Sequence, residues 1–365
     1  MKVAIMGAGM SGLACAIVLE HNGIYPDIYE SRSRVGDRFI NAEALLNVLN
    51  RPINNAPDFF SKKYGIQLKP LASIKHITFF SKNSRGMLTG NLGWSNIRGR
   101  HDESYESQLA AQVKSKIIFN SKHTYDELSK EYSHVVLATG DGAYAEKLGN
   151  YITDLTLTAK GATVEGHFDA QHICSWLNYD FVPKGYAYLI PFSASEAHLV
   201  IGFPEYPGNI KRSVQDYWET FYQTACRDLN QDLHITDNFE VNGYMVGRSI
   251  KPKIDNTYYT GNCFGSLTPA FAFGQFMSIL TGVYAAQDIC GIGDYETEAK
   301  QLYKVYENSL VLRRYMEGLD NDKLDRYVQM FNLSLVNMFF GSRVKTDIFK
   351  LLSYLARTSV KNKRA

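Results

Sequence analysis

The first thirty residues place the strongest limit on the fold of this chain. Lys2–Met6 is a short apolar run that predicts a buried strand, and Gly7–Gly12 follows it as a glycine-rich turn. Leu13–Asn22 has helical spacing and ends before Gly23, and Pro26–Glu30 predicts a second strand. Strand, turn, helix and strand in this order form a βαβ unit. The sequence therefore predicts an α/β fold with a parallel, Rossmann-type sheet.

The turn of this unit fits the pattern G-x-G-x-x-G. Gly7 allows a tight turn, Gly9 lets a pyrophosphate approach the backbone, and Gly12 lets helix and strand pack closely. The pyrophosphate would bind free N–H groups at the positive end of the helix dipole. Glu30 ends the second strand, where a carboxylate binds ribose hydroxyls and disfavours a 2′-phosphate. The nucleotide, NAD or FAD, is therefore expected at Gly7, Gly9, Met10, Ser11, Gly12 and Glu30, with Arg38 as a further partner.

A second glycine motif favours FAD over NAD. Tyr258–Thr260 predicts a short strand that runs into Gly261-Asn262, and Leu267–Gly274 leads into an apolar helix predicted over Phe273–Asp288. This second helix start offers backbone N–H groups to another part of the same ligand. An extended cofactor with a flavin at its far end needs such a second site, whereas NAD does not.

These motifs resemble the p-hydroxybenzoate hydroxylase superfamily of FAD enzymes, most closely its geranylgeranyl reductase branch. In that family the second motif runs G-D-A-A-G and then P-x-x-G-x-G, and Gly261-Asn262, Pro269 and Gly274 match it here. Asn262 replaces the Asp that normally bonds the ribityl chain, and Ala272 replaces a glycine beside the flavin ring. The resemblance implies that Gly261, Asn262, Pro269 and Gly274 lie against the ribityl and isoalloxazine groups.

Two further segments extend the resemblance. Gly140-Asp141-Gly142 follows a predicted strand and is similar to a D-G motif of the family. The Ser and Arg that follow it in the hydroxylases, where NADPH docks, are replaced by Ala145 and Leu148. Arg98, ahead of a predicted helix over Ser104–Lys114, resembles the segment whose Arg approaches the flavin. The resemblance thus adds Gly140 and Arg98 to the expected cofactor site.

The expected substrate side is the segment Pro183–Pro191, with the pattern P-x-x-Y-x-Y-x-x-P. Tyr186 and Tyr188 are two apart, so on a strand both point to the same face. The geranylgeranyl reductases have a similar P-x-x-Y-x-W-x-F-P, which lines a long apolar pocket over the flavin. The resemblance implies a substrate pocket at Tyr186, Tyr188 and Pro191, while the residues alone favour ordinary sheet packing.

The rest of the chain suggests three parts. Short alternating segments from Tyr151 to Val241 predict an antiparallel sheet, with one helix around Val214–Arg227. Ala42–Leu49 is helix-like, and the chain beyond Tyr295 is predicted helical. The expected domains are a discontinuous FAD-binding domain (1–150 with 244–295), an inserted substrate domain (151–243) and a C-terminal helical region (296–365).

Composition excludes several classes of function. The 39 basic and 37 acidic residues give a net charge of +2, without the basic excess typical of a nucleic-acid binder. The five cysteines form no CxxC, so neither a disulfide scaffold nor a zinc ribbon is expected. His167, His172 and Cys174 lie close in sequence, but their spacing fits no standard zinc pattern, and no metal site is expected. No secretory leader is visible, and we expect a reduced, cytoplasmic monomer.

The C-terminus has a charge of its own. From Arg343 to Ala365 there are seven basic residues and one acid, 7 − 1 = +6, and Ile348, Leu351, Leu352 and Leu355 recur at helical spacing. A helix that caps the substrate domain and a peripheral contact with anionic lipid both fit this pattern.

Together these expectations describe an FAD-dependent oxidoreductase. By resemblance, the reaction is the reduction of carbon–carbon double bonds in an isoprenoid or similar apolar substrate, and the flavin carries the hydride chemistry. The electron donor and any catalytic side chain stay unidentified. The alternatives are a group A flavin monooxygenase that acts on an aromatic substrate, and a non-catalytic flavin- or lipid-binding protein.

Overall fold

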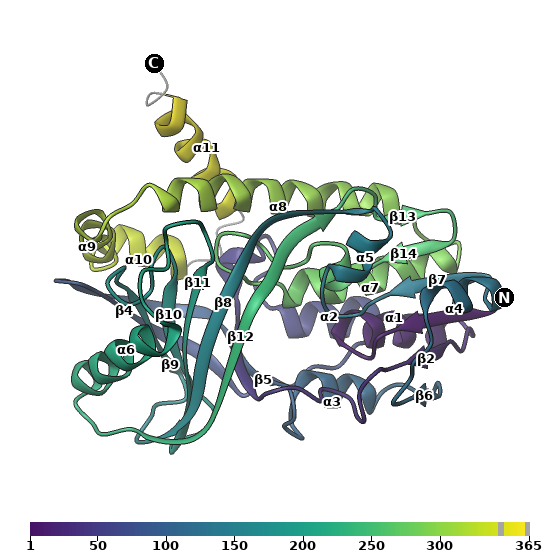
Figure 1. The fold of residues 1–365 in the computed structure, drawn as a ribbon, viewed down its shortest axis with the longest axis horizontal. Coiled ribbons are helices and arrows are strands. Elements are labelled where there is room, and N and C mark those ends of the chain that lie inside the picture. The colour runs from purple at the N-terminus through teal and green to yellow at the C-terminus, as the bar shows by residue number, and fades with distance from the viewer. Residues whose placement is uncertain (342–346, 362–365) are drawn as a thin grey trace.

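Two β-sheets lie side by side along the molecule (Figure 1). The structure is a computed structural model, and it describes residues 1–341 and 347–361. The six-stranded sheet has the strand order β13 (Lys253–Ile254), β14 (Thr257–Tyr259), β7 (His134–Leu137), β1 (Val3–Met6), β2 (Asp27–Tyr29) and β6 (Ile117–Ile118).

The six-stranded sheet is parallel apart from its edge strand β13, which pairs antiparallel with β14. In its centre Ile5 of β1 lies opposite Ile28 of β2 and Val136 of β7. All four residues of β1 are buried, as expected for a parallel strand whose sheet is covered on both faces. The α/β fold with a parallel nucleotide-binding-type sheet is therefore confirmed.

The second sheet is antiparallel except where β4 and β9 run parallel. Its longest strands, β8 and β12, cross the middle of the molecule (Figure 1). The strand order is β12 (His234–Ser249), β8 (Tyr151–Glu165), β11 (Glu196–Pro204), β10 (Tyr186–Pro191), β9 (His172–Leu177), β4 (Ala72–Ser81), β5 (Arg85–Arg98) and β3 (Asn41–Leu46).

This second sheet is wider than the sequence predicted. Strands β3, β4 and β5 precede residue 150, so the sheet is not confined to 151–243. The helix predicted over Ala42–Leu49 is also wrong, because this segment forms β3 and a 3₁₀ turn over Asn47–Leu49. Its residues favour helix, but Ala42 and Ala44 are buried against β5, and this pairing overrides local propensity. The domain boundaries themselves stay a prediction.

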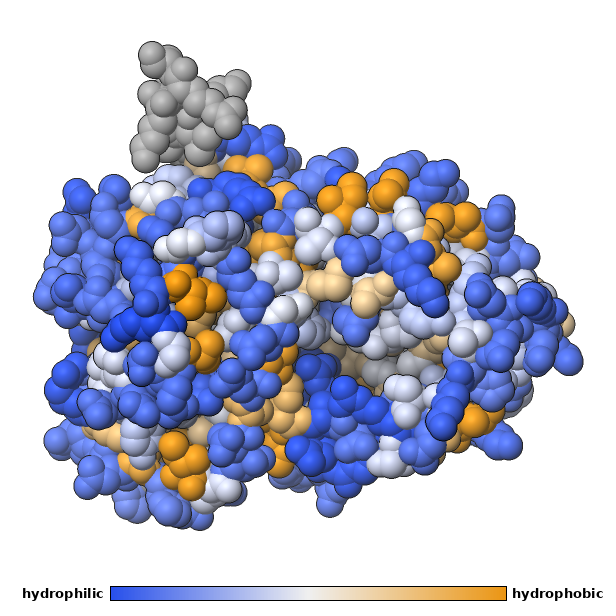
Figure 2. All heavy atoms as spheres, viewed as in Figure 1, coloured by the Kyte–Doolittle hydropathy of each residue, from blue (hydrophilic) through white to orange (hydrophobic). Residues whose placement is uncertain are grey.

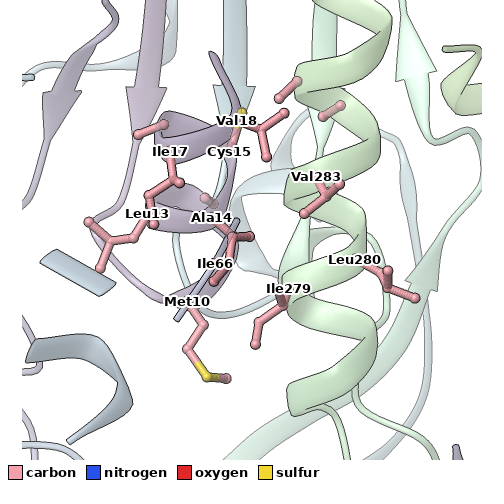
Figure 3. Packing of buried hydrophobic residues seen from close by; sticks show 14 of the residues in the cluster. Met10, Leu13, Ala14, Cys15, Ile17, Val18, Ile66, Ile279, Leu280 and Val283 are labelled. Carbon is pink, nitrogen blue, oxygen red and sulfur yellow. The ribbon is translucent and has the colours of Figure 1, made fainter. Parts of the chain in front are cut away.

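Eleven α-helices are described, and two of them pack closely beneath the first sheet. Met10 of α1 lies beside Ile279 of α7, and Leu13 belongs to the same buried cluster (Figure 3). A Cβ on Gly282 of α7 would lie 2.0 Å from the carbonyl oxygen of Ser11, so glycine is required for this crossing. The helices are α1 (Met10–His21), α2 (Ala56–Tyr64), α3 (Tyr105–Ala110), α4 (Tyr125–Glu131), α5 (Ala143–Lys147), α6 (Val214–Leu229), α7 (Gln275–Ile289), α8 (Tyr295–Glu317), α9 (Asn321–Met330), α10 (Ser334–Gly341) and α11 (Ile348–Lys361).

The remaining helices cover the second sheet unequally. Helix α6 packs Trp218 and Phe221 on one face, against Trp176 and Leu199. The opposite face points toward the first sheet and the C-terminal helices. Helix α8 runs along both sheets, and α11 lies against α8 and projects away from the body (Figure 1). Within the described residues, no helix is both long enough and apolar enough to cross a membrane.

Candidate functional site

A single large cavity connects the two sheets. Its volume is about 1480 Å³, whereas pockets for one small molecule measure roughly 300–1,000 Å³, so it has room for more than one ligand. It begins at Gly7, Glu30, Gly140 and Gly261, which lie beyond the carboxyl ends of β1, β2, β7 and β14. The chain leaves β1 for β2 on one side, while β7 lies on the other. Ligands of open α/β sheets bind at such a switch point.

The first glycine motif has three different environments. A Cβ on Gly7 (φ +110°) would lie 2.2 Å from the carbonyl oxygen of Ala138, so no side chain fits there. A Cβ on Gly9 would meet no atom within 4 Å, because this position opens onto the cavity. Gly12 does not line the cavity. Its Cβ would lie 2.1 Å from the carbonyl oxygen of Gly7, so it serves the packing of α1 on the turn.

Two long helices present uncapped N-termini to the cavity. Among α1–α9, only α1, α5 and α7 lack a side chain that accepts a hydrogen bond from the first turn, and their N-cap residues are Gly9, Gly142 and Gly274. The starts of α1 and α7 line the cavity at Ser11 and Gln275. Their free N–H groups and positive dipole ends are available to anionic or polar groups of a ligand.

The two glycine motifs contact each other. A Cβ on Gly261 would lie 2.6 Å from Oγ of Ser11, and the Gly261 N–H donates to Oγ1 of Thr281 (2.8 Å). The sequence predicted that both motifs serve one ligand, and the fold places them at one end of the same cavity.

Glu30 is held against the first motif. Its Oε2 accepts from the N–H of Ala8 (2.9 Å), and its Oε1 accepts from the N–H of Arg32 (2.9 Å). Arg38 also lines the cavity, with its guanidinium 5.0 Å from the ring centroid of Phe39. Both predicted nucleotide partners therefore lie at this end.

Arg98 is not a free positive charge. Its Nε donates to Oε1 of Glu106 (2.6 Å) and its Nη1 to Oε1 of Glu43 (3.2 Å). Burial alone would lower the pKa of Arg98, but the charges of Glu106 and Glu43 outweigh this and raise the pKa above its usual value. Oε2 of Glu106 is buried without a hydrogen-bond partner, although Glu106 lines the cavity.

Glu43 connects this ion cluster to both ends of the site. The amide of Gln275, at the start of α7, donates to Oε2 of Glu43. The amide of Asn41 donates to Oε1 of Glu43 (2.8 Å), and the hydroxyl of Tyr188 donates to Oδ1 of Asn41 (3.2 Å). We call Asn41, Glu43, Arg98, Glu106 and Gln275 the Glu43 cluster. Sequence reasoning missed all of them except Arg98.

Asn262 uses its amide in a way that Asp could not. Its Nδ2 donates to the carbonyl oxygen of Gly140 (2.9 Å) and to the hydroxyl of Tyr244 (2.7 Å), and its Oδ1 accepts from Oγ of Ser266 (2.8 Å). A carboxylate has no proton to donate to a carbonyl. The departure from the Asp of the resembled family therefore has a local structural reason.

The segment that leads into α7 also lies at the cavity. Pro269 and Gly274 line it, and Ala272 between them adopts φ +53°. This is the left-handed region, which costs a residue with a Cβ roughly 1–2 kcal/mol. The resembled family has glycine at the position of Ala272.

Tyr186 and Tyr188 point into the cavity from β10, with ring centroids 6.1 Å apart. Burial raises the pKa of both hydroxyls, so both stay protonated at neutral pH. Pro191, which the resemblance placed in the same substrate pocket, does not line this cavity. An odd number of positions separates it from the tyrosines, so it lies on the opposite face, at a second cavity of about 340 Å³.

The smaller cavity also contains His167, His172 and Cys174. Across residues 1–341 and 347–361, no three His, Cys, Asp or Glu side chains are arranged to hold a metal ion. Cys263 is buried, and desolvation raises the pKa of its thiol to about 11, so it is not a reactive thiolate at neutral pH.

Beyond the tyrosines the cavity becomes apolar. The face of the second sheet opposite α6 supplies Ile77, Phe79 and Leu88, and the C-terminal helices close the space opposite. The predicted residues that line the cavity are Gly7, Gly9, Met10, Ser11, Glu30, Arg38, Arg98, Gly140, Tyr186, Tyr188, Gly261, Asn262, Pro269 and Gly274.

Comparisons with known proteins agree with this architecture. A family model described as an NAD(P)-binding Rossmann-like domain matches residues 5–65. No curated protein matches the chain.

Solved structures match over nearly the whole chain. A geranylgeranyl bacteriochlorophyll reductase-like protein from Thermoplasma acidophilum has a TM-score of 0.72 at 14% identity, with 97% of this chain and 98% of that chain covered. The flavin-dependent brominase Bmp2 has a TM-score of 0.67 at 15% identity, with 100% and 99% covered. The halogenase PltM, in complex with phloroglucinol and FAD, has a TM-score of 0.64 at 11% identity, with 100% and 93% covered. At these identities the likeness establishes the fold.

Proposed function

We propose that this protein is an FAD-dependent oxidoreductase that reduces carbon–carbon double bonds of an isoprenoid or similarly apolar substrate. The observation that carries the proposal is the single large cavity, which has the uncapped starts of α1 and α7 at one end and an apolar chamber at the other. A polar, anionic cofactor and an apolar substrate fit these two ends by their chemistry.

Three features of the polar end support FAD as the cofactor. Gly9 leaves open space beside the start of α1, the start of α7 is uncapped, and Oε2 of Glu106 lacks a hydrogen-bond donor that a ligand hydroxyl or N–H would supply. The ADP half would be held by Gly7, Gly9, Met10, Ser11, Glu30 and Arg38, and the ribityl and ring portion by Gly140, Gly261, Asn262, Pro269 and Gly274.

Bound FAD would supply the hydride chemistry. The chain's own part is to bind and orient. Glu43 bonds Gln275 at the start of α7 and, through Asn41, the hydroxyl of Tyr188, so one carboxylate positions both the cofactor end and the substrate end. Arg98 and Glu106 balance its charge within the protein.

The apolar end would exclude water and hold an extended hydrocarbon. Tyr186 and Tyr188 provide two flat faces at the boundary, which suit a planar double bond. Apolar side chains such as Ile77, Leu88 and Phe331 then continue the lining. Burial of each CH₂ group contributes about 0.8 kcal/mol, so a long chain needs few polar contacts for affinity.

The first test is the visible absorption spectrum of the purified protein, before and after reconstitution with FAD. Flavin bands are expected, and their absence after reconstitution would overturn the proposal. The second test is incubation of the chemically reduced holoprotein with a polyprenyl substrate in the absence of oxygen. Mass spectrometry should detect the gain of two hydrogen atoms per double bond.

A flavin-dependent oxygenation or halogenation of an aromatic substrate is the second candidate. It is favoured by the likeness to Bmp2 and PltM over the full length of this chain. Oxygen uptake in the presence of NADPH and a phenol, with no reduction of prenyl substrates, would select this candidate. A yellow protein that no electron donor reduces would indicate a flavin carrier instead.

A further inference from the structure

Exposed apolar side chains gather at the C-terminal end of the chain. Of the sixteen large hydrophobic side chains that are exposed among the described residues, seven lie between residues 327 and 354. Figure 2 shows hydrophobic residues at the surface beside the base of α11, on a face that is mostly hydrophilic. We call the seven the C-terminal apolar surface: Tyr327, Met330, Leu333, Leu335, Met338, Leu351 and Tyr354.

This surface is continuous with the wall of the large cavity. Four of its members, Tyr327, Met330, Leu335 and Leu351, line the cavity as well as contact solvent. Leu335 is 74% exposed and Met338 is 64% exposed, and α10 has no buried residue. Among the described residues, the short helix α10 therefore lies between the apolar chamber and the solvent.

Helix α10 is attached to the body through hydrogen bonds and through Val336 and Phe340, whereas Leu335 and Met338 stay largely exposed. The amide of Asn337 accepts from the N–H of Thr89 (2.7 Å) and donates to the carbonyl oxygen of Met87 (3.1 Å), both on β5. The guanidinium of Arg51 donates to the carbonyl oxygen of Phe339 (2.6 Å). These bonds fix the backbone while Leu335 and Met338 point outward.

Positive charge accompanies the apolar surface. Lys350 and Arg357 of α11 are exposed, and the sequence from 343 to 365 carries a charge of +6. Arg343, Lys345, Lys363 and Arg364 contribute to this charge but lie outside the described residues. Exposed apolar side chains beside basic ones match a bilayer with anionic lipids, since the apolar side chains enter the interface while the basic ones are attracted to the negative headgroups.

We propose that the C-terminal apolar surface docks onto an anionic membrane and that the cavity opens there. An apolar substrate would then pass from the bilayer into the chamber under α10 without crossing water. The docking stands independently, while the passage of substrate rests on the proposed function.

Vesicle co-sedimentation of the full chain tests the docking. We expect binding to vesicles of phosphatidylcholine with phosphatidylserine, and weaker binding to phosphatidylcholine alone. L335Q/M338Q should reduce binding at least tenfold, and K350E/R357E should reduce it several-fold and weaken its dependence on salt. The matched control I250Q/I292Q replaces two exposed isoleucines far from this surface and should bind like the wild type.

Several results would overturn the docking. The first is a wild-type protein that does not bind vesicles, and the second is L335Q/M338Q that binds as well as the wild type. The third is a wild-type dimer that the L335Q/M338Q substitution dissociates, because a second copy of the chain would then cover the surface. Circular dichroism and a thermal melt check that the variants fold. The measurement needs neither flavin nor substrate, so its failure is distinguishable from failure of the proposed function.

The passage of substrate has its own readout. With substrate supplied in anionic vesicles, L333Q/M338Q, which replaces two exposed side chains of this surface that do not line the cavity, should lower kcat/KM at least tenfold. With the same substrate in detergent micelles, the two proteins should differ less than twofold. An equal loss in both would show that these side chains act inside the chamber and would overturn the passage.

Discussion

Replacement of Gly9 by alanine should separate cofactor binding from folding. Gly9 has φ −87° and ψ −177°, an extended conformation that any residue adopts, and a Cβ there meets no atom within 4 Å. The variant should therefore fold normally. Because alanine restricts the unfolded chain more than glycine does, the free energy of unfolding should be unchanged or higher by up to about 1 kcal/mol.

Binding should respond differently, because the added methyl occupies the space beside the free N–H groups of α1. If FAD loses one hydrogen bond to its charged pyrophosphate, the cost is about 1.5–3 kcal/mol. This corresponds to a Kd that is roughly 10- to 150-fold weaker. Titration of FAD followed by quenching of its fluorescence measures the change, and urea denaturation without FAD measures stability.

Gly282→Ala is the matched control. Its Cβ would lie 2.0 Å from the carbonyl oxygen of Ser11, so overpacking should destabilise the protein by about 1–3 kcal/mol or more. Gly282 does not line the cavity, so the loss should appear first in stability. Wild-type affinity for FAD in the Gly9→Ala variant would refute the placement of the pyrophosphate over this glycine.

Three further predictions concern His198, Arg98 and Ala272. Burial lowers the pKa of His198 from 6.5 to about 3, so the unfolded chain binds the extra proton. The free energy of unfolding should therefore fall by about 1.4 kcal/mol per pH unit as pH drops below 6.5. Urea denaturation at several pH values should give H198F a smaller dependence of this free energy on pH, and an equal dependence in the two proteins would contradict the prediction. Arg98→Met leaves Glu43 and Glu106 without a counter-charge and should cost about 3–5 kcal/mol at neutral pH, much of which R98M/E43Q/E106Q should restore. Ala272→Gly relieves a left-handed backbone and should raise the midpoint of thermal unfolding, with a net gain of up to about 1 kcal/mol; a lower midpoint would be inconsistent with strain at this position.

The parts of the site that the sequence located are local. The turn at Gly7–Gly9 is followed directly by its helix, which begins at Met10, and the segment before α7 likewise runs directly into its helix. Backbone N–H groups at a helix start are placed by the helix itself, so a contiguous pattern suffices to find them. For this reason Gly9, Ser11 and Gly274 were found without knowledge of the fold.

The Glu43 cluster could not be found in this way. Glu43 lies in a segment whose residues favour helix, and only the pairing of β3 with β5 places it beside Arg98. Glu106 reaches Arg98 from the start of α3. No spacing in the sequence relates these residues, since the contacts depend on the register of strands and not on distance along the chain.

The sequence by itself determined the βαβ unit, the open glycine turns and the face on which Tyr186 and Tyr188 lie, because each follows from short-range geometry of the backbone. Only the tertiary structure decided that β3, β4 and β5 join the second sheet and that α10 closes the apolar end of the cavity. These arrangements depend on which apolar faces are buried against one another. That choice is made by the whole chain at once, because hydrophobic burial is non-directional and can bring together residues at any separation along the sequence.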